Sequence, residues 1–176
     1  MEEEKKEEQE EEKKNYLKDI LTFALIIIGV LLVKKYIVTP VQVSGDSMYS
    51  TLKDGDIMIL NKVSYKIHGI KRFDVVVINS GGSLIIKRVI GLPNEIIRIK
   101  DNKLYINDVE IEQDFLPEGE TTADYKYETG DNCYFVMGDN RDISKDSREL
   151  GCFDISKIEG TTSFTIFPFN RIGFKN

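Results

Sequence analysis

The stretch DVVVINSGGSLIIKRVIG, residues 74–91, consists of two runs rich in valine and isoleucine that flank the pair Gly81-Gly82. Runs of β-branched residues bounded by turn-forming glycines are typical of β-strands. Further runs of the same kind are DIMILNKVSY (56–65), EIIRIKDNKLYIN (95–107) and CYFVMG (133–138). No helical pattern of about 10–15 residues follows residue 40. We therefore predict a compact, mostly β domain over residues 39–176.

A lysine lies inside the second of these runs. Lys87 follows Leu84-Ile85-Ile86 and precedes Val89-Ile90. Its neighbour Arg88 should face the other side, because side chains alternate along a strand. If apolar groups bury the Lys87 amine, its pKa falls from about 10.4 toward neutrality and the amine can act as a base. The alternative is an edge-strand lysine that faces water. The strand pattern alone leaves both possibilities open.

Composition limits the classes of partner and cofactor. The chain has 176 residues and a net charge of −6, which argues against the concentrated basic face that nucleic acids require. Cys133, Cys152 and the single histidine, His68, supply at most three nitrogen or sulfur ligands, so we expect no metal and no cofactor. The two cysteines could form one disulfide if the domain lies outside the cell. The sequence leaves their pairing open.

The N-terminal region combines a charged tail with a long apolar segment. Residues 1–16 are a low-complexity charged run that we predict to be a solvated cytoplasmic tail. Residues 17–38 would span about 33 Å as a helix, enough to cross a bilayer. A buried core helix or a cleaved signal peptide are the alternatives. The segment is apolar on every side and lacks an A-x-A-like cleavage site, so we predict a single-pass membrane anchor.

The lysines that flank this segment suggest its orientation. Five lysines precede its uninterrupted apolar part, residues 20–33, at positions 5, 6, 13, 14 and 18, and three follow that part, at positions 34, 35 and 53. Positive charge is enriched on the cytoplasmic side of membrane helices. We therefore expect the N-terminus in the cytoplasm and the β domain outside, with the protein in the cell membrane.

Two further segments contain candidate functional side chains. VQVSGDSMYSTLKDGD, residues 41–56, presents Ser47 among glycine and short polar residues, and a serine hydroxyl needs a base to become a good nucleophile. His68 lies in a polar, loop-like stretch, which makes Lys87 the better candidate base. GDNRDISKDSRELG, residues 138–151, follows an apolar strand directly, a position where turns and ion pairs often orient functional side chains.

SGDSMYSTL, KRVIGLPNE and GDNRDISKDSRELG, in this order behind one N-terminal anchor, resemble the motifs of bacterial type I signal peptidases of the single-anchor, Gram-positive form. The resemblance covers the chain from Leu17 to its end. It implies a compact signal-peptidase-like β domain with a small β insert, over residues 94–132. It also implies a serine endopeptidase that removes signal peptides from exported precursor proteins, with the lipid bilayer as a second partner.

The resemblance also implies roles for individual residues. Ser47 would be the nucleophile, Lys87 the general base, and Ser144 a hydrogen-bonding group that orients the lysine amine. Met48 and the strand from Ile57 through Met58 and Ile59 to Leu60 would help to bind small substrate side chains. The charged positions of the third motif would form structural ion pairs: Asp139, Arg141, Asp146 and Arg148.

Two other functions fit parts of this pattern. A repressor-type self-cleaving protein also uses a serine and a lysine on a related β fold, but it carries a DNA-binding domain and a cleavable linker, which residues 1–40 do not provide. A non-catalytic, membrane-tethered β domain that binds extracellular peptides would need neither a nucleophile nor a base. Reaction of Ser47 with an acylating reagent would separate an enzyme from such a binding module.

Overall fold

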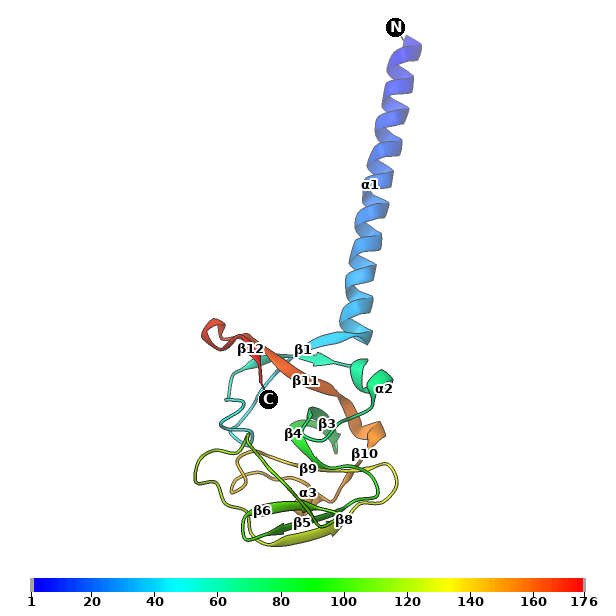
Figure 1. The fold of residues 1–176 in the computed structure, drawn as a ribbon. Coiled ribbons are helices and arrows are strands. Elements are labelled where there is room, and N and C mark those ends of the chain that lie inside the picture. Colours follow the sequence, from blue (N-terminus) through cyan, green and yellow to red (C-terminus); the bar gives the residue numbers. More distant parts are fainter. Residues whose placement is uncertain (1, 176) are drawn as a thin grey trace. The chain divides into compact units, whose positions relative to one another are not determined.

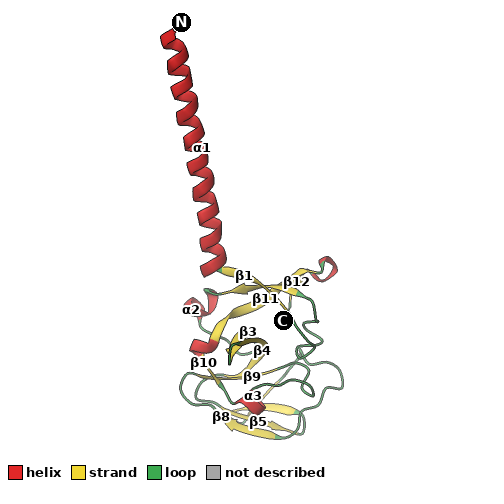
Figure 2. Cartoon of the chain, turned by 180° about the vertical axis from the view of Figure 1, so that it is seen from behind, coloured by secondary structure: helices red, strands yellow, loops and turns green. Residues whose placement is uncertain are grey.

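The computed structural model describes residues 2–175, with side chains from residue 13 onward, and divides the chain into two compact units, Met1–Ile37 and Val38–Asn176. The first unit is a single helix, α1 (Glu2–Tyr36) (Figure 1). The second unit is mostly β, as Figure 2 shows in yellow. The prediction of a mostly β chain behind one N-terminal apolar helix is therefore confirmed.

Helix α1 has the length and composition needed to cross a membrane. Its segment Lys13–Tyr36 has 24 residues, and an 18-residue window within it has a mean hydropathy of 2.2 and no buried residue. The Thr22 hydroxyl donates to the Lys18 carbonyl at 2.8 Å, so this polar group is satisfied within the helix. The backbone helix also includes the charged run that we predicted to be a solvated tail.

The larger sheet of the β unit contains eight strands within the described residues. Seven of them follow the order β1-β2-β11-β3-β4-β9-β10, and the eighth, β12, pairs with β11. These strands are β1 (Val38–Gln42), β2 (Ile57–Asn61), β3 (Val75–Ser80), β4 (Ser83–Gly91), β9 (Cys133–Met137), β10 (Phe153–Asp154), β11 (Ile158–Phe167) and β12 (Gly173–Phe174). Strand β4 is therefore an interior strand, between β3 and β9.

The predicted pair of strands at residues 74–91 forms the β3–β4 hairpin. Its register runs from Val75 opposite Arg88 to Ser80 opposite Ser83. The two-residue turn needs glycine, because Gly81 and Gly82 have φ angles of 63° and 94°.

A second, smaller sheet is inserted between two neighbouring strands of the larger one. Residues 92–132 leave the larger sheet after β4 and return to it at β9. The inserted strands are β5 (Ile96–Lys100), β6 (Lys103–Ile106), β7 (Val109–Ile111) and β8 (Tyr125–Glu128), in the order β7-β6-β5-β8. The insert predicted over residues 94–132 falls within this stretch. Its buried residues pack with Phe135 and Met137 of β9, which joins the two sheets through one apolar cluster.

Several elements differ from the expectations drawn from the strand pattern. The predicted strand at residues 56–65 ends at Asn61, and α2 (Ser64–His68) begins inside it. Strand β11 is the longest strand of the domain, yet its mixture of Thr, Gly and Glu with apolar residues gave no clear alternation. The remaining short elements are α3 (Ser147–Leu150), η1 (Ile155–Lys157) and η2 (Phe169–Arg171).

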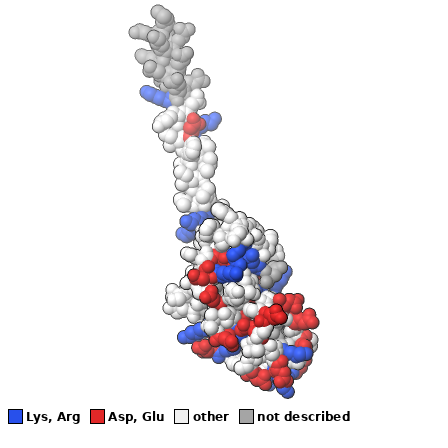
Figure 3. Space-filling view, turned by 90° about the vertical axis from the view of Figure 1, so that its left-hand side faces the viewer, with Lys and Arg blue, Asp and Glu red and all other residues white. Residues whose placement is uncertain are grey.

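On the face drawn in Figure 3, acidic and basic side chains are mixed over the β unit, and the apolar part of the helix appears as a white cylinder between charged residues. This face therefore offers no extended basic surface, in agreement with the net charge of −6.

The structure pairs the two cysteines. Cys133, at the start of β9, forms a disulfide with Cys152, just before β10, with a Cα–Cα distance of 5.5 Å. Strand β10 pairs with β9 antiparallel, with Asp154 opposite Cys133. The disulfide therefore closes the loop that contains the charged segment, residues 138–151, and fixes both of its ends to the same edge of the sheet.

Replacing both cysteines by alanine should lower the free energy of unfolding by about 3 kcal/mol, the value expected for a loop of this size. The loop spans a sequence separation of 19 residues. Thermal unfolding of the full chain in detergent measures the change. A reductant should lower the midpoint of the wild type by a similar amount and leave the double variant unchanged. A wild-type midpoint that a reductant does not move would contradict the pairing.

Candidate active site

Ser47 lies in the segment Val43–Asp56 between β1 and β2, which we call the serine loop. The backbone closes the loop at its base, because Val43 N–H donates to Asp56 O at 2.8 Å and Gly55 N–H donates to Val43 O at 3.0 Å. Inside the loop, Leu52 N–H donates to Met48 O at 2.9 Å, and both of these side chains are buried. The loop is thus an ordered turn anchored in the core, with Ser47 next to its buried anchor Met48.

The structure brings Ser47 and Lys87 together, although 40 positions separate them. The Lys87 Nζ atom lies 2.7 Å from the Ser47 Oγ atom. Lys87 is only 4% exposed and sits on β4, between β3 and β9. The alternative of an edge-strand lysine facing water is therefore wrong. This contact is within the range required for direct proton transfer between a nucleophile and its base.

The surroundings of Lys87 favour an uncharged amine. Ile85 and Val89 share its face of β4, and Val76 lies directly opposite it on β3. These three side chains belong to, or pack against, one apolar cluster that also contains Val136 of β9. Burial lowers the pKa of Lys87 below its ordinary value, and this effect outweighs the attraction of the carboxylates of Asp139 and Asp146.

Arg88 faces the opposite side of β4 and forms a buried ion pair with Asp139. Its Nε and Nη2 atoms lie 2.9 Å and 2.7 Å from the two carboxylate oxygens, and both side chains are at most 2% exposed. The guanidinium also stacks on the Phe115 ring at 4.1 Å and donates to Thr51 Oγ1 at 3.2 Å. Arg88 therefore links the start of the charged segment to the serine loop.

The rest of the charged segment is held by Asp146. Its carboxylate accepts from Gly138 N–H at 3.0 Å and pairs with Arg148 at 2.9 Å. Burial alone would raise the pKa of Asp146, but the hydrogen bonds from Arg148 and Gly138 lower it below its usual value. Asp146 therefore stays charged at neutral pH. It links Gly138, at the start of the charged segment, to Arg148, near its end.

Arg141 is also buried, at 2% exposure, but among the described residues it has no recorded salt bridge. Its guanidinium donates instead to Gly138 O at 3.1 Å, to Thr122 Oγ1 at 2.9 Å and to Gln113 Oε1. Burial lowers its pKa to about 10, which leaves the group charged at neutral pH.

Ser144 lies beside the serine loop, and its hydroxyl has no hydrogen-bond partner among the described residues. The side chain is 5% exposed. It lies near enough to the Asp146 carboxylate to help lower that group's pKa, but not in hydrogen-bonding geometry. A Cβ added at Gly138 would collide with both Ser144 Oγ and the Ser47 carbonyl oxygen. Glycine at 138 thus allows the charged segment and the serine loop to meet.

The residues predicted to bind substrate divide between two faces. Met48 and Met58 are buried in one apolar cluster with Val43, Leu52 and Val75. Leu60 is buried too, on the face of β2 that carries Met58, whereas Ile57 and Ile59 alternate to the other face and are partly exposed. The structure therefore brings Met48 and Met58 together near Ser47 and separates them from the two isoleucines.

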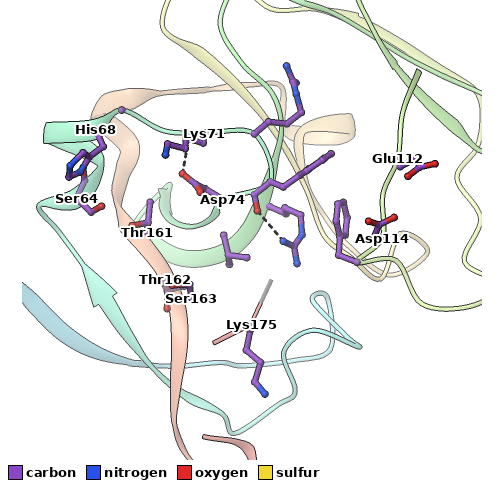
Figure 4. A pocket seen from close by; sticks show the side chains of 16 residues that line it. Ser64, His68, Lys71, Asp74, Glu112, Asp114, Thr161, Thr162, Ser163 and Lys175 are labelled. Atoms are coloured by element: carbon purple, nitrogen blue, oxygen red, sulfur yellow. Dashed lines mark hydrogen bonds between the residues drawn. The ribbon is translucent and has the colours of Figure 1, made fainter. Parts of the chain in front are cut away.

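Neither Ser47 nor Lys87 lines the cavity of about 800 Å³ that Figure 4 shows. His68 is one of its lining residues, and its Nδ1 atom lies 3.2 Å from Ser64 O. Among the described residues, His68 thus bonds within its own helix, while the Ser47 hydroxyl bonds Lys87.

Some positioning contacts could not be predicted from the motifs. Asn140 N–H donates to the Ser47 carbonyl at 3.1 Å, which fixes the backbone of the serine loop to the charged segment. Arg171, near the C-terminus, pairs with Asp56 at the base of the loop. Backbone contacts leave little signal in side-chain type, and no local pattern links two residues 115 positions apart.

Comparison with known proteins gives a consistent result. The family model described as "Signal peptidase, peptidase S26" matches residues 13–167. Signal peptidase I T of Bacillus subtilis is 40% identical over 155 residues, which cover 81% of this chain and 80% of that protein. Signal peptidase IB of Staphylococcus aureus is 34% identical over 174 residues, which cover 88% of this chain and 91% of that protein. A solved structure of a signal peptidase I of Enterococcus faecalis is 33% identical in sequence. Its superposition covers 52% of this chain and 95% of the solved chain, with a TM-score of 0.48.

The lowered pKa of Lys87 predicts how the reactivity of Ser47 depends on pH. Only the neutral amine can accept the hydroxyl proton, so reactivity should rise with pH through the pKa of the buried amine. Burial places that pKa below the ordinary 10.5. The rate of labelling by a serine-directed acylating reagent, measured against pH, should therefore have its midpoint below 10.5. A midpoint at the value of an exposed lysine would contradict the desolvated base.

Proposed function

The chain belongs to the peptidase S26 family of signal peptidases, and we propose that Ser47 and Lys87 carry out its reaction as nucleophile and general base. It is a serine endopeptidase, a signal peptidase I that acts on precursor proteins carrying signal peptides. The single observation that supports the proposed pair is the 2.7 Å contact between a buried amine and the Ser47 hydroxyl.

In the proposed acylation step, the Ser47 Oγ atom attacks the scissile carbonyl carbon while the neutral Lys87 amine accepts the hydroxyl proton. The tetrahedral intermediate then collapses, and the Lys87 ammonium donates that proton to the departing amine. The mature protein therefore leaves first, and the signal peptide stays bound to Ser47 as an ester.

Deacylation uses the same two residues in the same way. Lys87 is neutral again after acylation, so it can take a proton from a water molecule as the water oxygen attacks the ester carbon. Ser47 Oγ leaves and recovers its proton from Lys87, which releases the signal peptide as a carboxylic acid. The proton cycle thus closes between one hydroxyl and one amine. The negative charge that develops on the carbonyl oxygen needs donors, and we assign the Ser47 backbone N–H as one of them.

We assign Ser144 to orient the lysine amine. Its hydroxyl is buried without a recorded partner, which leaves it available to a neighbouring donor or acceptor. Its Oγ atom and the Ser47 carbonyl oxygen would both collide with a Cβ at Gly138, so the two groups lie close together. Asp139, Arg141, Asp146 and Arg148 hold this segment in place through the ion pairs and hydrogen bonds described above.

For substrate binding we propose the apolar cluster beside Ser47. Met48 and Met58 pack there with Val43 and Leu52 and are at most 1% exposed, so they would form the apolar base of a pocket for small, uncharged substrate side chains. Ile57 and Ile59 lie on the other face of β2. These two side chains are partly exposed, so a substrate could reach them, whereas the buried Leu60 would support the strand from the face that carries Met58.

We place α1 across the cell membrane, with the N-terminus in the cytoplasm and the β unit outside. Two observations support this orientation. Lysines are more numerous before the apolar segment than after it. The Cys133–Cys152 disulfide also suits an oxidising compartment outside the cytoplasm. An anchored enzyme meets a membrane-inserted precursor at a higher effective concentration than a free one would.

Ser47→Ala and Lys87→Ala should each reduce cleavage of a signal-peptide-bearing precursor by at least about a thousandfold, because nucleophile and base act as one unit. The controls are Ser83→Ala, at an exposed serine, and Lys103→Ala, at a lysine in the inserted sheet. Both should cleave at the wild-type rate. Cleavage by either dyad variant at a rate near that of the controls would refute the dyad. Loss of labelling by an acylating reagent in Ser47→Ala would also distinguish the enzyme from a peptide-binding module.

The proposed orientation predicts which side of the membrane the β unit occupies. A cysteine introduced at the exposed position Ser83 should react with a membrane-impermeant maleimide in intact cells. The two native cysteines are disulfide-bonded, so the wild type provides the unlabelled control. Labelling of Ser83→Cys only after the cells are lysed would place the β unit in the cytoplasm.

A further inference from the structure

The C-terminal part of the chain reaches the serine loop through one arginine. Strand β11 pairs with β2 so that Phe167 lies opposite Ile57, and η2 then turns the chain back toward β12. Arg171, the last residue of η2, thereby lies beside Asp56, where the serine loop ends. This contact joins two parts of the chain that are 115 residues apart.

The contact between these two residues is a two-point ion pair. Arg171 Nε and Nη2 lie 2.9 Å from Asp56 Oδ1 and Oδ2, respectively. The Asp56 side chain is 2% exposed and that of Arg171 is 21% exposed. Burial alone would raise the pKa of Asp56, but the hydrogen bonds from Arg171 and from Lys53 N–H hold it below its usual value. The carboxylate therefore stays charged and paired.

The same pair also holds the backbone of the serine loop. Arg171 Nη2 donates to the Thr51 carbonyl at 3.3 Å, and Asp56 Oδ2 accepts from Lys53 N–H at 3.0 Å. The hydroxyl of Thr51 is bonded at the same time to Arg88, the neighbour of Lys87. Thr51 is thus held from one side by the strand that carries the base and from the other side by Arg171.

We propose that Arg171, through its fork to Asp56 and Thr51, is a positioning residue that sets the location of Ser47 relative to Lys87. A proton transfer over 2.7 Å tolerates little displacement, and a loop held only at its base could tilt about its closing hydrogen bonds. Arg171 and Arg88 fix the second half of the loop, residues 51–56, from two directions. Misplacement of a reacting group by about 1 Å can cost about a hundredfold in rate.

This inference rests on the proposed dyad, and the key variant is Arg171→Lys. A lysine keeps the positive charge beside Asp56, so the fold should persist, but one ammonium cannot reproduce the planar fork that spans Asp56 and Thr51. We expect kcat for precursor cleavage to fall by about tenfold, within the cost of a sub-ångström misplacement. KM should change by less than about twofold, because the hydrogen bonds of Arg171 go to Asp56 and Thr51 and not to the residues proposed to bind substrate.

A second variant separates positioning from stability. The double change Asp56→Leu with Arg171→Met replaces a largely buried ion pair by apolar groups, a change that proteins often tolerate with little loss of stability. This variant should unfold near the wild-type temperature and still acylate Ser47 at least about tenfold more slowly, because the bond to Thr51 is absent. Acylation is measured with the serine-directed reagent on the full chain in detergent, well below the unfolding midpoint of each variant.

The matched control is Arg98→Lys, at an arginine paired with the exposed Asp108 in the inserted sheet, and it should keep the wild-type kcat. Arg171→Lys with a kcat within about twofold of the wild type would overturn the inference, as would normal acylation by the folded double variant. Ser47→Ala is assayed in parallel. If that variant still cleaves, the proposed dyad itself fails, whereas an inactive Ser47→Ala beside an active Arg171→Lys refutes only the positioning role.

Discussion

The proposed chemistry depends on keeping one amine uncharged next to one hydroxyl. A lysine loses its charge only where apolar groups replace water, and Lys87 meets this condition on an interior strand, among Ile85, Val89 and Val76. The same burial would leave the amine far from any substrate if a second element did not bring Ser47 to within 2.7 Å. The order of strands in the sheet buries Lys87, and the anchored serine loop places Ser47 against it, so both are needed for the contact between the two side chains.

Side chains alternate between the two faces of β4, so the adjacent basic residues Lys87 and Arg88 have different surroundings. Lys87 faces the apolar cluster and Ser47, while Arg88 faces Asp139, Phe115 and Thr51. An arginine keeps its charge when buried and bonds in a fixed fork, so it suits a structural ion pair, whereas a buried lysine can become neutral and act as a base. One strand can thus supply both the base and a contact that holds the serine loop in place.

The inserted sheet and the disulfide act on the same region. The insert leaves the larger sheet after β4 and returns at β9, and Phe115 from this insert stacks on Arg88. The charged segment that follows β9 is closed by the Cys133–Cys152 bond and tied internally by Asp146. Gly138 lets this segment approach the Ser47 carbonyl. Covalent and ionic links thus fix the loops that lie against Lys87 of β4, including the one that carries Ser47.

The sequence alone determined the features that depend on local pattern: the apolar helix, the β3–β4 hairpin with its two glycines, and three motifs whose residue types suit a serine nucleophile with a lysine base. Tertiary structure decided what depends on distant neighbours. Strand order determines three such features: the burial of Lys87, the pairing of Cys133 with Cys152, and the contact between Arg171 and Asp56. Burial and ion pairing are properties of neighbours in space, and strands far apart in the chain supply those neighbours.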